Sequence, residues 1–138
     1  MTTTAVLTGA CGCGAVTFEL SEPLGDAMYC HCTRCQRRSG GSTGAAAWAQ
    51  PGSFRITSGE QELRRWAPPG GMVKVFCGIC GSGLWAEMAD DPAKVAIRLG
   101  AVDGDPGVRP SARIFAADAA PWEPIPDDGL PRYDGFPG

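Results

Sequence analysis

Short stretches of alternating apolar and polar residues recur along the chain, and glycine or proline bounds them. In residues 15–20, Val16, Phe18 and Leu20 fall on one face and polar residues on the other, which is typical of a half-buried β-strand. The same alternation predicts strands over residues 54–57, 62–66, 72–76 and 94–99. Apolar spacing long enough for a packed helix is absent, and the most helical segment is one or two turns over residues 33–39. The pattern predicts a mainly β protein.

Glycine and proline supply the turns that such a fold needs. The chain has 20 glycines and 12 prolines in 138 residues, a length that predicts one domain over residues 1–138. Prolines recur from about residue 119 onward, so residues 119–138 are predicted to be neither a central strand nor a helix. The aromatic residues Trp122, Tyr133 and Phe136 suggest that this tail is pinned onto the domain.

The charge and hydropathy of the chain exclude several classes of function. A net charge of −3 argues against nucleic acid as a partner, because phosphate binding needs a basic surface. The sequence has no apolar run near the roughly 20 residues that span a bilayer, so a membrane partner is not expected. The N-terminus also lacks the basic start and apolar stretch of a secretory signal, which predicts a cytoplasmic protein.

Cysteine is the unusual residue of this sequence. Seven cysteines are an odd number, and in a reducing compartment they indicate metal binding or catalysis more than disulfides. They fall in three groups: Cys11 and Cys13, then Cys30, Cys32 and Cys35, then Cys77 and Cys80. The last group resembles half of a zinc knuckle, which needs a second pair of thiols to complete a tetrahedral site.

Two partitions of these thiols are compatible with their spacing. In the first, Cys11 and Cys13 join Cys77 and Cys80 in a closed four-cysteine zinc site, and the middle group forms a three-cysteine site with an open position, as in catalytic zinc sites. In the alternative, the middle group joins Cys77 and Cys80, so that zinc has only a structural role. The first partition predicts two zinc ions per chain.

The residues around the middle cysteines suggest what an open site could do. If residues 29–32 are extended, Cys30 and Cys32 point to one side and His31 to the other, so His31 is not expected to be a ligand. Zinc held by three thiolates suits the binding of an incoming thiol, which loses its proton on coordination. Arg37 and Arg38 follow at once and could contact carboxylates of an anionic thiol, or could belong to a solvated turn.

Three cysteine motifs resemble those of the glutathione-dependent formaldehyde-activating enzyme family, which includes the centromere protein V domain. They are GACGCGAV at residues 9–16, CHCTRC at 30–35 and FCGICG at 76–81. The resemblance implies a mainly β fold of the Mss4-like type. It also implies a structural zinc on Cys11, Cys13, Cys77 and Cys80, and a second zinc, catalytic by implication, on Cys30, Cys32 and Cys35.

The family's name-giving reaction joins glutathione and formaldehyde into S-(hydroxymethyl)glutathione. By this resemblance the chain is expected to be a zinc-dependent carbon–sulfur lyase, or thiol-adduct synthase, with a small thiol such as glutathione as its partner. The other hypothesis is a non-catalytic, zinc-stabilised module that binds a protein through its β surface. An exchangeable position on the three-cysteine zinc would distinguish them, because a binding module does not need one.

Overall fold

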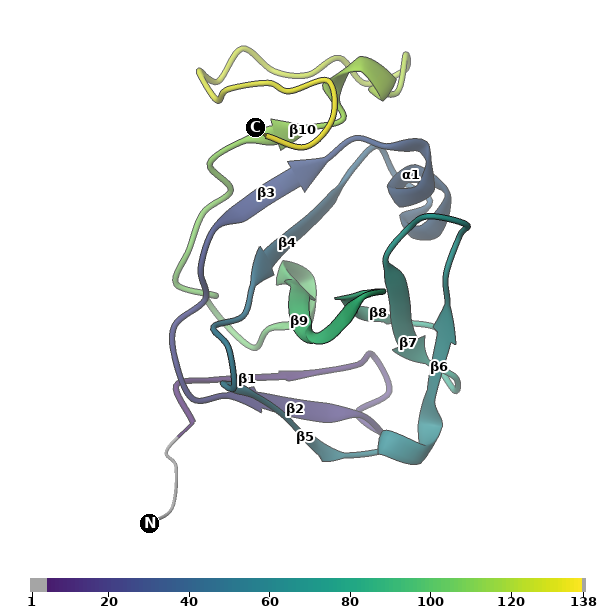
Figure 1. Cartoon of the computed structure of the whole chain (residues 1–138), viewed down its shortest axis with the longest axis vertical. Coiled ribbons are helices and arrows are strands. Elements are labelled where there is room, and N and C mark those ends of the chain that lie inside the picture. Colours follow the sequence, from purple (N-terminus) through teal and green to yellow (C-terminus); the bar gives the residue numbers. More distant parts are fainter. Residues whose placement is uncertain (1–4, 138) are drawn as a thin grey trace.

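The computed structural model describes residues 5–137, which fold into two β-sheets and a few short helices (Figure 1). Strands β1, β2 and β5 form a three-stranded sheet, and the seven-stranded sheet has the order β10-β3-β4-β9-β8-β7-β6. The strands are β1 (Leu7–Ala10), β2 (Thr17–Leu20), β3 (Ala27–Cys30), β4 (Gly44–Trp48), β5 (Phe54–Ser58), β6 (Leu63–Trp66), β7 (Val73–Cys77), β8 (Gly83–Met88), β9 (Asp91–Arg98) and β10 (Arg113–Ile114).

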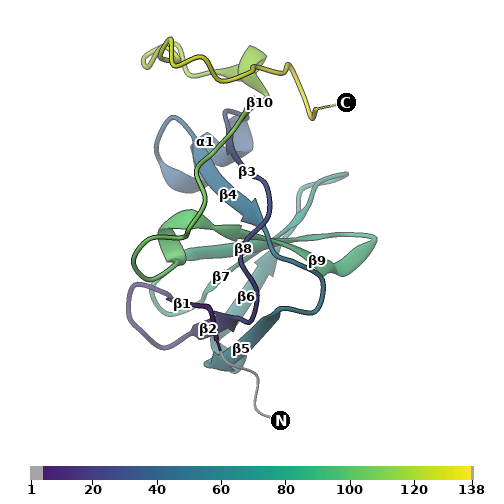
Figure 2. The same cartoon turned by 90° about the vertical axis from the view of Figure 1, so that its left-hand side faces the viewer.

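Helix α1 (Thr33–Ser39) connects β3 to β4, and three single-turn 3₁₀ helices, η1 (Glu60–Glu62), η2 (Leu99–Ala101) and η3 (Ala116–Asp118), lie in connections. The mainly β fold with a short helix after the middle cysteines is confirmed. Helix α1 and the C-terminal segment lie at one end of the molecule, and the three-stranded sheet lies at the other (Figures 1 and 2).

The hydrophobic core combines residues of both sheets. Phe18 of β2 and Trp85 of β8 are almost fully buried, and their rings lie 5.9 Å apart in an edge-on arrangement. Phe54 of β5 packs on both, with ring centroids 5.6 Å from Phe18 and 4.7 Å from Trp85. Val16 and Leu20 are fully buried beside Phe18, so the predicted inward face of residues 15–20 is confirmed.

Several strands have no alternating signal in the sequence. Strand β4 reads GAAAW, and alanine has a low preference for strands. This segment is extended because it pairs with β3 on one side and β9 on the other, which satisfies its backbone hydrogen bonds. A strand of small residues in the middle of the large sheet leaves space above that sheet.

The proline-rich segment returns to the body of the protein. Arg113 donates its backbone N–H to the Pro131 carbonyl and accepts from the backbone N–H of Tyr133. The rings of Phe115 and Phe136 meet edge-on at 5.1 Å. That residues 1–138 make one domain with this tail included stays a prediction. Among residues 5–137, no helix is both long enough and apolar enough to cross a membrane.

Candidate metal centres and the cavity beside them

The four cysteines of the predicted closed zinc site lie together in the structure. Cys11 follows β1, Cys13 lies in the turn before β2, Cys77 ends β7 and Cys80 lies in the turn before β8. Their sulfur atoms all lie within 4.8 Å of one another, with 3.6 Å between Cys11 and Cys13 and 3.9 Å between Cys13 and Cys77. Tetrahedral zinc with Zn–S bonds of about 2.3 Å places its sulfurs about 3.8 Å apart, so this cluster fits a closed metal site.

The backbone around this cluster is arranged to meet the sulfurs. Val16 donates its backbone N–H to the Cys11 sulfur at 3.3 Å, and Ile79 donates to the Cys77 sulfur at 3.4 Å. Such bonds stabilise thiolates over thiols. The turn after Cys80 uses Gly81 at a φ of 79°, a left-handed conformation that glycine adopts without strain.

The second cluster is local, and helix α1 builds it. Cys30 is the last residue of β3, Cys32 is the N-cap of α1 and Cys35 lies in the helix, and their sulfurs all lie within 4.8 Å of one another. Cys35 donates its backbone N–H to the Cys32 sulfur at 3.3 Å. A cap by sulfur in place of the usual oxygen fixes Cys32 at the helix start, where the helix dipole favours a negative charge.

The thiols of this triad differ in pKa because they lie close to one another. Hydrogen bonds from the Cys30 and Cys35 thiols, with help from backbone N–H groups, lower the pKa of Cys32 to about 2. The Cys32 side chain in turn raises the pKa of Cys30 well above its usual value. One thiol therefore ionises readily and the others do so only when a cation neutralises the cluster. The triad fits a metal ion on these chemical grounds.

His31 lies between Cys30 and Cys32 in the sequence but belongs to neither cysteine cluster. Its Nε2 lies 3.2 Å from the Arg113 guanidinium, and the residue is buried. Arg113 also donates to the Asp128 carboxylate at 2.6 and 3.2 Å and lies over the ring of Tyr29 at 4.4 Å. Burial, followed by the charge of Arg113, lowers the pKa of His31. Sequence reasoning did not find this group, because Asp128 precedes Gly129 and therefore resembles a turn residue.

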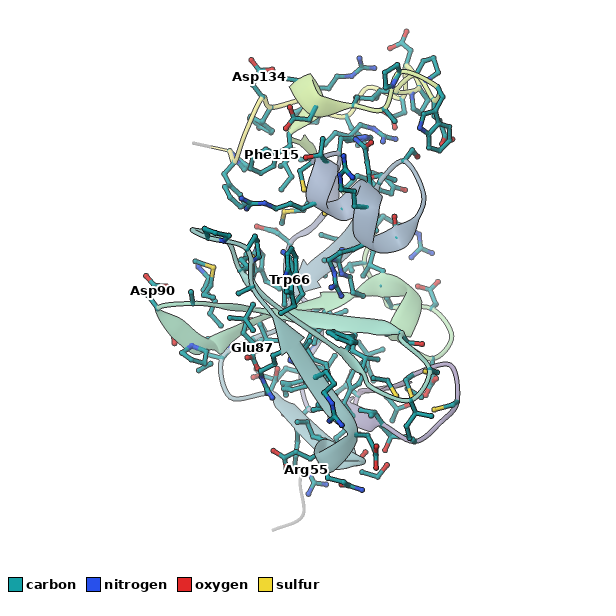
Figure 3. All side chains as sticks on the ribbon, turned by 90° about the vertical axis from the view of Figure 1, so that its right-hand side faces the viewer. Arg55, Trp66, Glu87, Asp90, Phe115 and Asp134 are labelled. Carbon is teal, nitrogen blue, oxygen red and sulfur yellow. The ribbon has the colours of Figure 1, made fainter. Side chains whose placement is uncertain are left out.

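The triad lines a cavity of about 860 Å³ above one face of the seven-stranded sheet. Lys74 of β7 and Arg98 of β9 line it with the cysteines, and neither is in an ion pair with any described residue. Burial lowers the pKa of Lys74, while the cysteine thiols act in the opposite direction. Phe115 and Asp90, which also line the cavity, lie beside α1 and at the tip of the β8–β9 hairpin (Figure 3).

Lys74 and Arg98 were missed by the sequence analysis. Both occupy polar positions of alternating stretches and therefore resemble solvent-facing residues of a strand. Of the two arginines singled out instead, Arg37 is exposed and lines neither cavity, whereas the Arg38 guanidinium lies 5.5 Å from the centre of the Phe76 ring. Arg38 lines a second cavity of about 650 Å³, which Cys35 and Arg98 also line.

Comparison with known proteins agrees with the resemblance of the cysteine motifs. The sequence model of the family described as "Glutathione-dependent formaldehyde-activating enzyme" matches residues 6–118. A crystal structure of a Rhodobacter sphaeroides protein is similar over 91% of this chain and 98% of its own, with a TM-score of 0.60 and 25% sequence identity. No curated protein sequence matches the chain significantly.

Proposed function

The chain belongs to the glutathione-dependent formaldehyde-activating enzyme family, and on this premise we propose that it is a zinc-dependent thiol-adduct synthase, or carbon–sulfur lyase. Its substrate is a small anionic thiol of the glutathione kind, which binds beside Cys30, Cys32 and Cys35 and adds to an aldehyde. The observation that carries this proposal is the position of the triad, because its three sulfurs lie within 4.8 Å of one another in the wall of a large cavity.

The two clusters have different roles in this proposal. Cys11, Cys13, Cys77 and Cys80 hold a structural zinc, since four thiolates leave no coordination position for a substrate. Cys30, Cys32 and Cys35 hold a second zinc with one position open. When bound there, zinc supplies a Lewis acid that lowers the pKa of a coordinating thiol and keeps its sulfur as a nucleophile.

The charges of the chain favour an anionic thiol. Three thiolates and one Zn²⁺ ion carry one negative charge, and Lys74 and Arg98 add two positive charges to the same cavity. Arg34, Asp90 and Asp118 also line the cavity but are exposed to solvent, whereas Lys74 and Arg98 are half-buried, so these two cations dominate the charge beside the triad. Because both side chains have no carboxylate partner among residues 5–137, their donors are available to the thiol's own carboxylates.

Thiol binding to the zinc-loaded protein, measured by calorimetry, tests this function. We expect glutathione to bind, and Cys32→Ser to abolish binding while it releases one of two zinc ions. Lys74→Met should lower the affinity for glutathione by about tenfold, since a charge-assisted hydrogen bond is lost. It should leave the zinc content unchanged. Cysteamine, a thiol with a positive charge, is the matched probe and should not lose affinity in Lys74→Met.

Two results would contradict the proposal. If two metal ions are bound and no small thiol binds, the triad is not a substrate site, and a protein-binding module becomes the better account. If Lys74→Met weakens glutathione and cysteamine equally, the lysine acts on the fold of the cavity and does not select charge.

A further inference from the structure

The floor of the large cavity is made of small residues in the central strands of the sheet. Directly paired residues of neighbouring strands share a face, and the pairs run from Trp48 of β4 to Ala96 of β9, then to Ala86 of β8 and Lys74 of β7. Ala46 occupies the same face of β4, two residues before Trp48. All five residues line the cavity. The hollow therefore exists because three alanines stand where most strands carry larger side chains.

Strand β4 leads from the cysteine triad across the floor of the cavity. Cys30 pairs with Gly44 at one end of β4, and Arg98 pairs with Ala46, two residues further along the strand. Trp48 lies two residues beyond Ala46, and so roughly 13 Å from Gly44 at about 3.3 Å per residue. Arg98 thus lies between the triad and Trp48 along this direction, and Lys74 ends the row of floor residues that begins at Trp48.

Methionines and aromatic rings complete the apolar part. Met28, Met72 and Met88 all line the cavity, as does Phe115. Methionine side chains are flexible and polarisable, so they adapt to apolar ligands of varied shape. The acidic lining residues Asp90 and Asp118 are exposed, and the side chains of the floor between Lys74 and Trp48 carry no charge.

We infer that the carbonyl substrate is an aldehyde with an apolar chain or ring of several carbons, and not formaldehyde alone. This inference rests on the proposed function, in which the charged groups of the thiol contact Lys74 and Arg98. Pockets of 300–1,000 Å³ enclose drug-sized ligands, and this cavity of about 860 Å³ is in that range. A one-carbon aldehyde would leave the alanine floor, Trp48 and the methionines without a ligand.

The reaction is an addition and needs no oxidant or reductant. The sulfur of the thiol forms a bond to the carbonyl carbon, and the π pair of the C=O bond moves to oxygen. The thiol has given its proton to solvent, and the new alkoxide takes one back, so the product is a hemithioacetal. The apolar chain of the aldehyde stays on the carbon bonded to sulfur, which places it over the floor.

S-alkylglutathiones are stable probes of this arrangement, because their alkyl group has the position of the aldehyde carbons. Calorimetry on the zinc-loaded protein would compare the S-methyl, S-propyl, S-butyl and S-hexyl compounds. We expect affinity to rise about fourfold per added methylene, because burial of one methylene contributes about 0.8 kcal/mol to the free energy of binding. Equal affinity from S-methyl to S-hexyl would overturn the inference.

Filling the floor should remove this dependence on chain length. Ala96→Leu places a larger side chain in the cavity, and S-hexylglutathione should then bind no better than S-methylglutathione, with zinc content unchanged. Ala46→Leu fills the floor from a different strand and serves if the first variant fails to fold. Ala93→Leu is the control, since Ala93 lies on the same strand as Ala96 but is exposed and outside the cavity. An unchanged slope in both folded floor variants would also overturn the inference.

The inference and the proposed function fail in different ways. If glutathione binds through its thiol but chain length has no effect, the inference alone is wrong. If affinity rises with chain length but no free thiol changes the visible spectrum of the cobalt-substituted protein, the cavity binds apolar ligands and the proposed thiol chemistry is wrong. If neither occurs, both are wrong.

Discussion

The two cysteine clusters should contribute unequally to stability, because they connect segments at very different separations along the chain. The perturbation is a pair of double variants, Cys13→Ser with Cys80→Ser and Cys30→Ser with Cys32→Ser. Cys13 and Cys80 are exposed, so their replacement removes two ligands without opening a cavity in the core. Cys30 and Cys32 are half-buried and provide the matched change in the triad.

The magnitude follows from the loops that each metal closes. A link between Cys13 and Cys77 closes about 65 residues, and the chain-entropy relation for cross-links gives about 4 kcal/mol for such a loop. The triad closes a loop of about six residues, from Cys30 to Cys35, for which the same relation gives about 2 kcal/mol. We therefore expect loss of the four-cysteine site to lower the free energy of unfolding by about 2 kcal/mol more than loss of the triad.

Urea denaturation of the zinc-loaded proteins, followed by circular dichroism, measures this difference, and elemental analysis gives the zinc content. Each double variant should retain one of two zinc ions. The control is the same measurement after chelation. The Cys13 and Cys80 variant should then lie near metal-free wild-type protein, since substitutions at exposed positions change stability by about 0.5 kcal/mol or less, and any metal-free loss of the half-buried Cys30 and Cys32 variant is subtracted from its loss with zinc. Equal losses in the zinc-loaded state, or a greater loss for the triad variant, would refute the division into a structural and a reactive site.

Two further predictions concern the packing of the sheets and the C-terminal segment. Gly9→Ala should lower the free energy of unfolding by about 1–3 kcal/mol in urea denaturation, because a methyl group there overlaps the Phe18 ring. Gly100→Ala is the control and should have little effect, because a methyl group there meets open space. Equal effects of the two substitutions would contradict this reason. Asp128→Asn should lower the thermal midpoint at pH 7, because the Arg113 hydrogen bond holds the pKa of Asp128 below its usual value in the folded state. That contribution is present above the unfolded pKa of about 4 and is lost as pH falls through the folded pKa, so wild type and variant should converge in acid, and a difference that is independent of pH would contradict it.

Part of the fold was accessible from the sequence because local signals and tertiary packing agree there. In and just before β2, alternation of Val16, Phe18 and Leu20 marks a buried face, and α1 spans the same residues, 33–39, that the sequence predicted as helical. The alternating segments of β5, β6, β7 and β9 were found within a few residues. Strands β1, β3, β4, β8 and β10 were not predicted, and β4 shows why. Alanines carry no periodic signal, so only the hydrogen bonds of β3 and β9 make that segment a strand.

The two cysteine clusters were accessible from the sequence in a similar way. Cysteines that lie two or three residues apart are held close together by the chain and bind a metal ion as one group, which limits how seven thiols can be divided. Their grouping as four and three, now seen in the folded chain, was one of two partitions that spacing allowed. The identity of the metal and the role of each site stay predictions. The surroundings of the triad were beyond sequence reasoning, since Lys74 and Arg98 come from strands that are 24 residues apart and meet only through sheet pairing.

The sequence by itself determined which thiols are available and how they are grouped, because seven cysteines and their spacing are covalent facts that no fold can change. It also determined which faces of its clearest strands are buried, since alternation of side chains is a property of any extended chain. Only the tertiary structure decided what lies beside the sulfurs of the triad. A cavity is the space that side chains from separate strands leave unfilled, and the register of β4, β9, β8 and β7 places small residues side by side to make it.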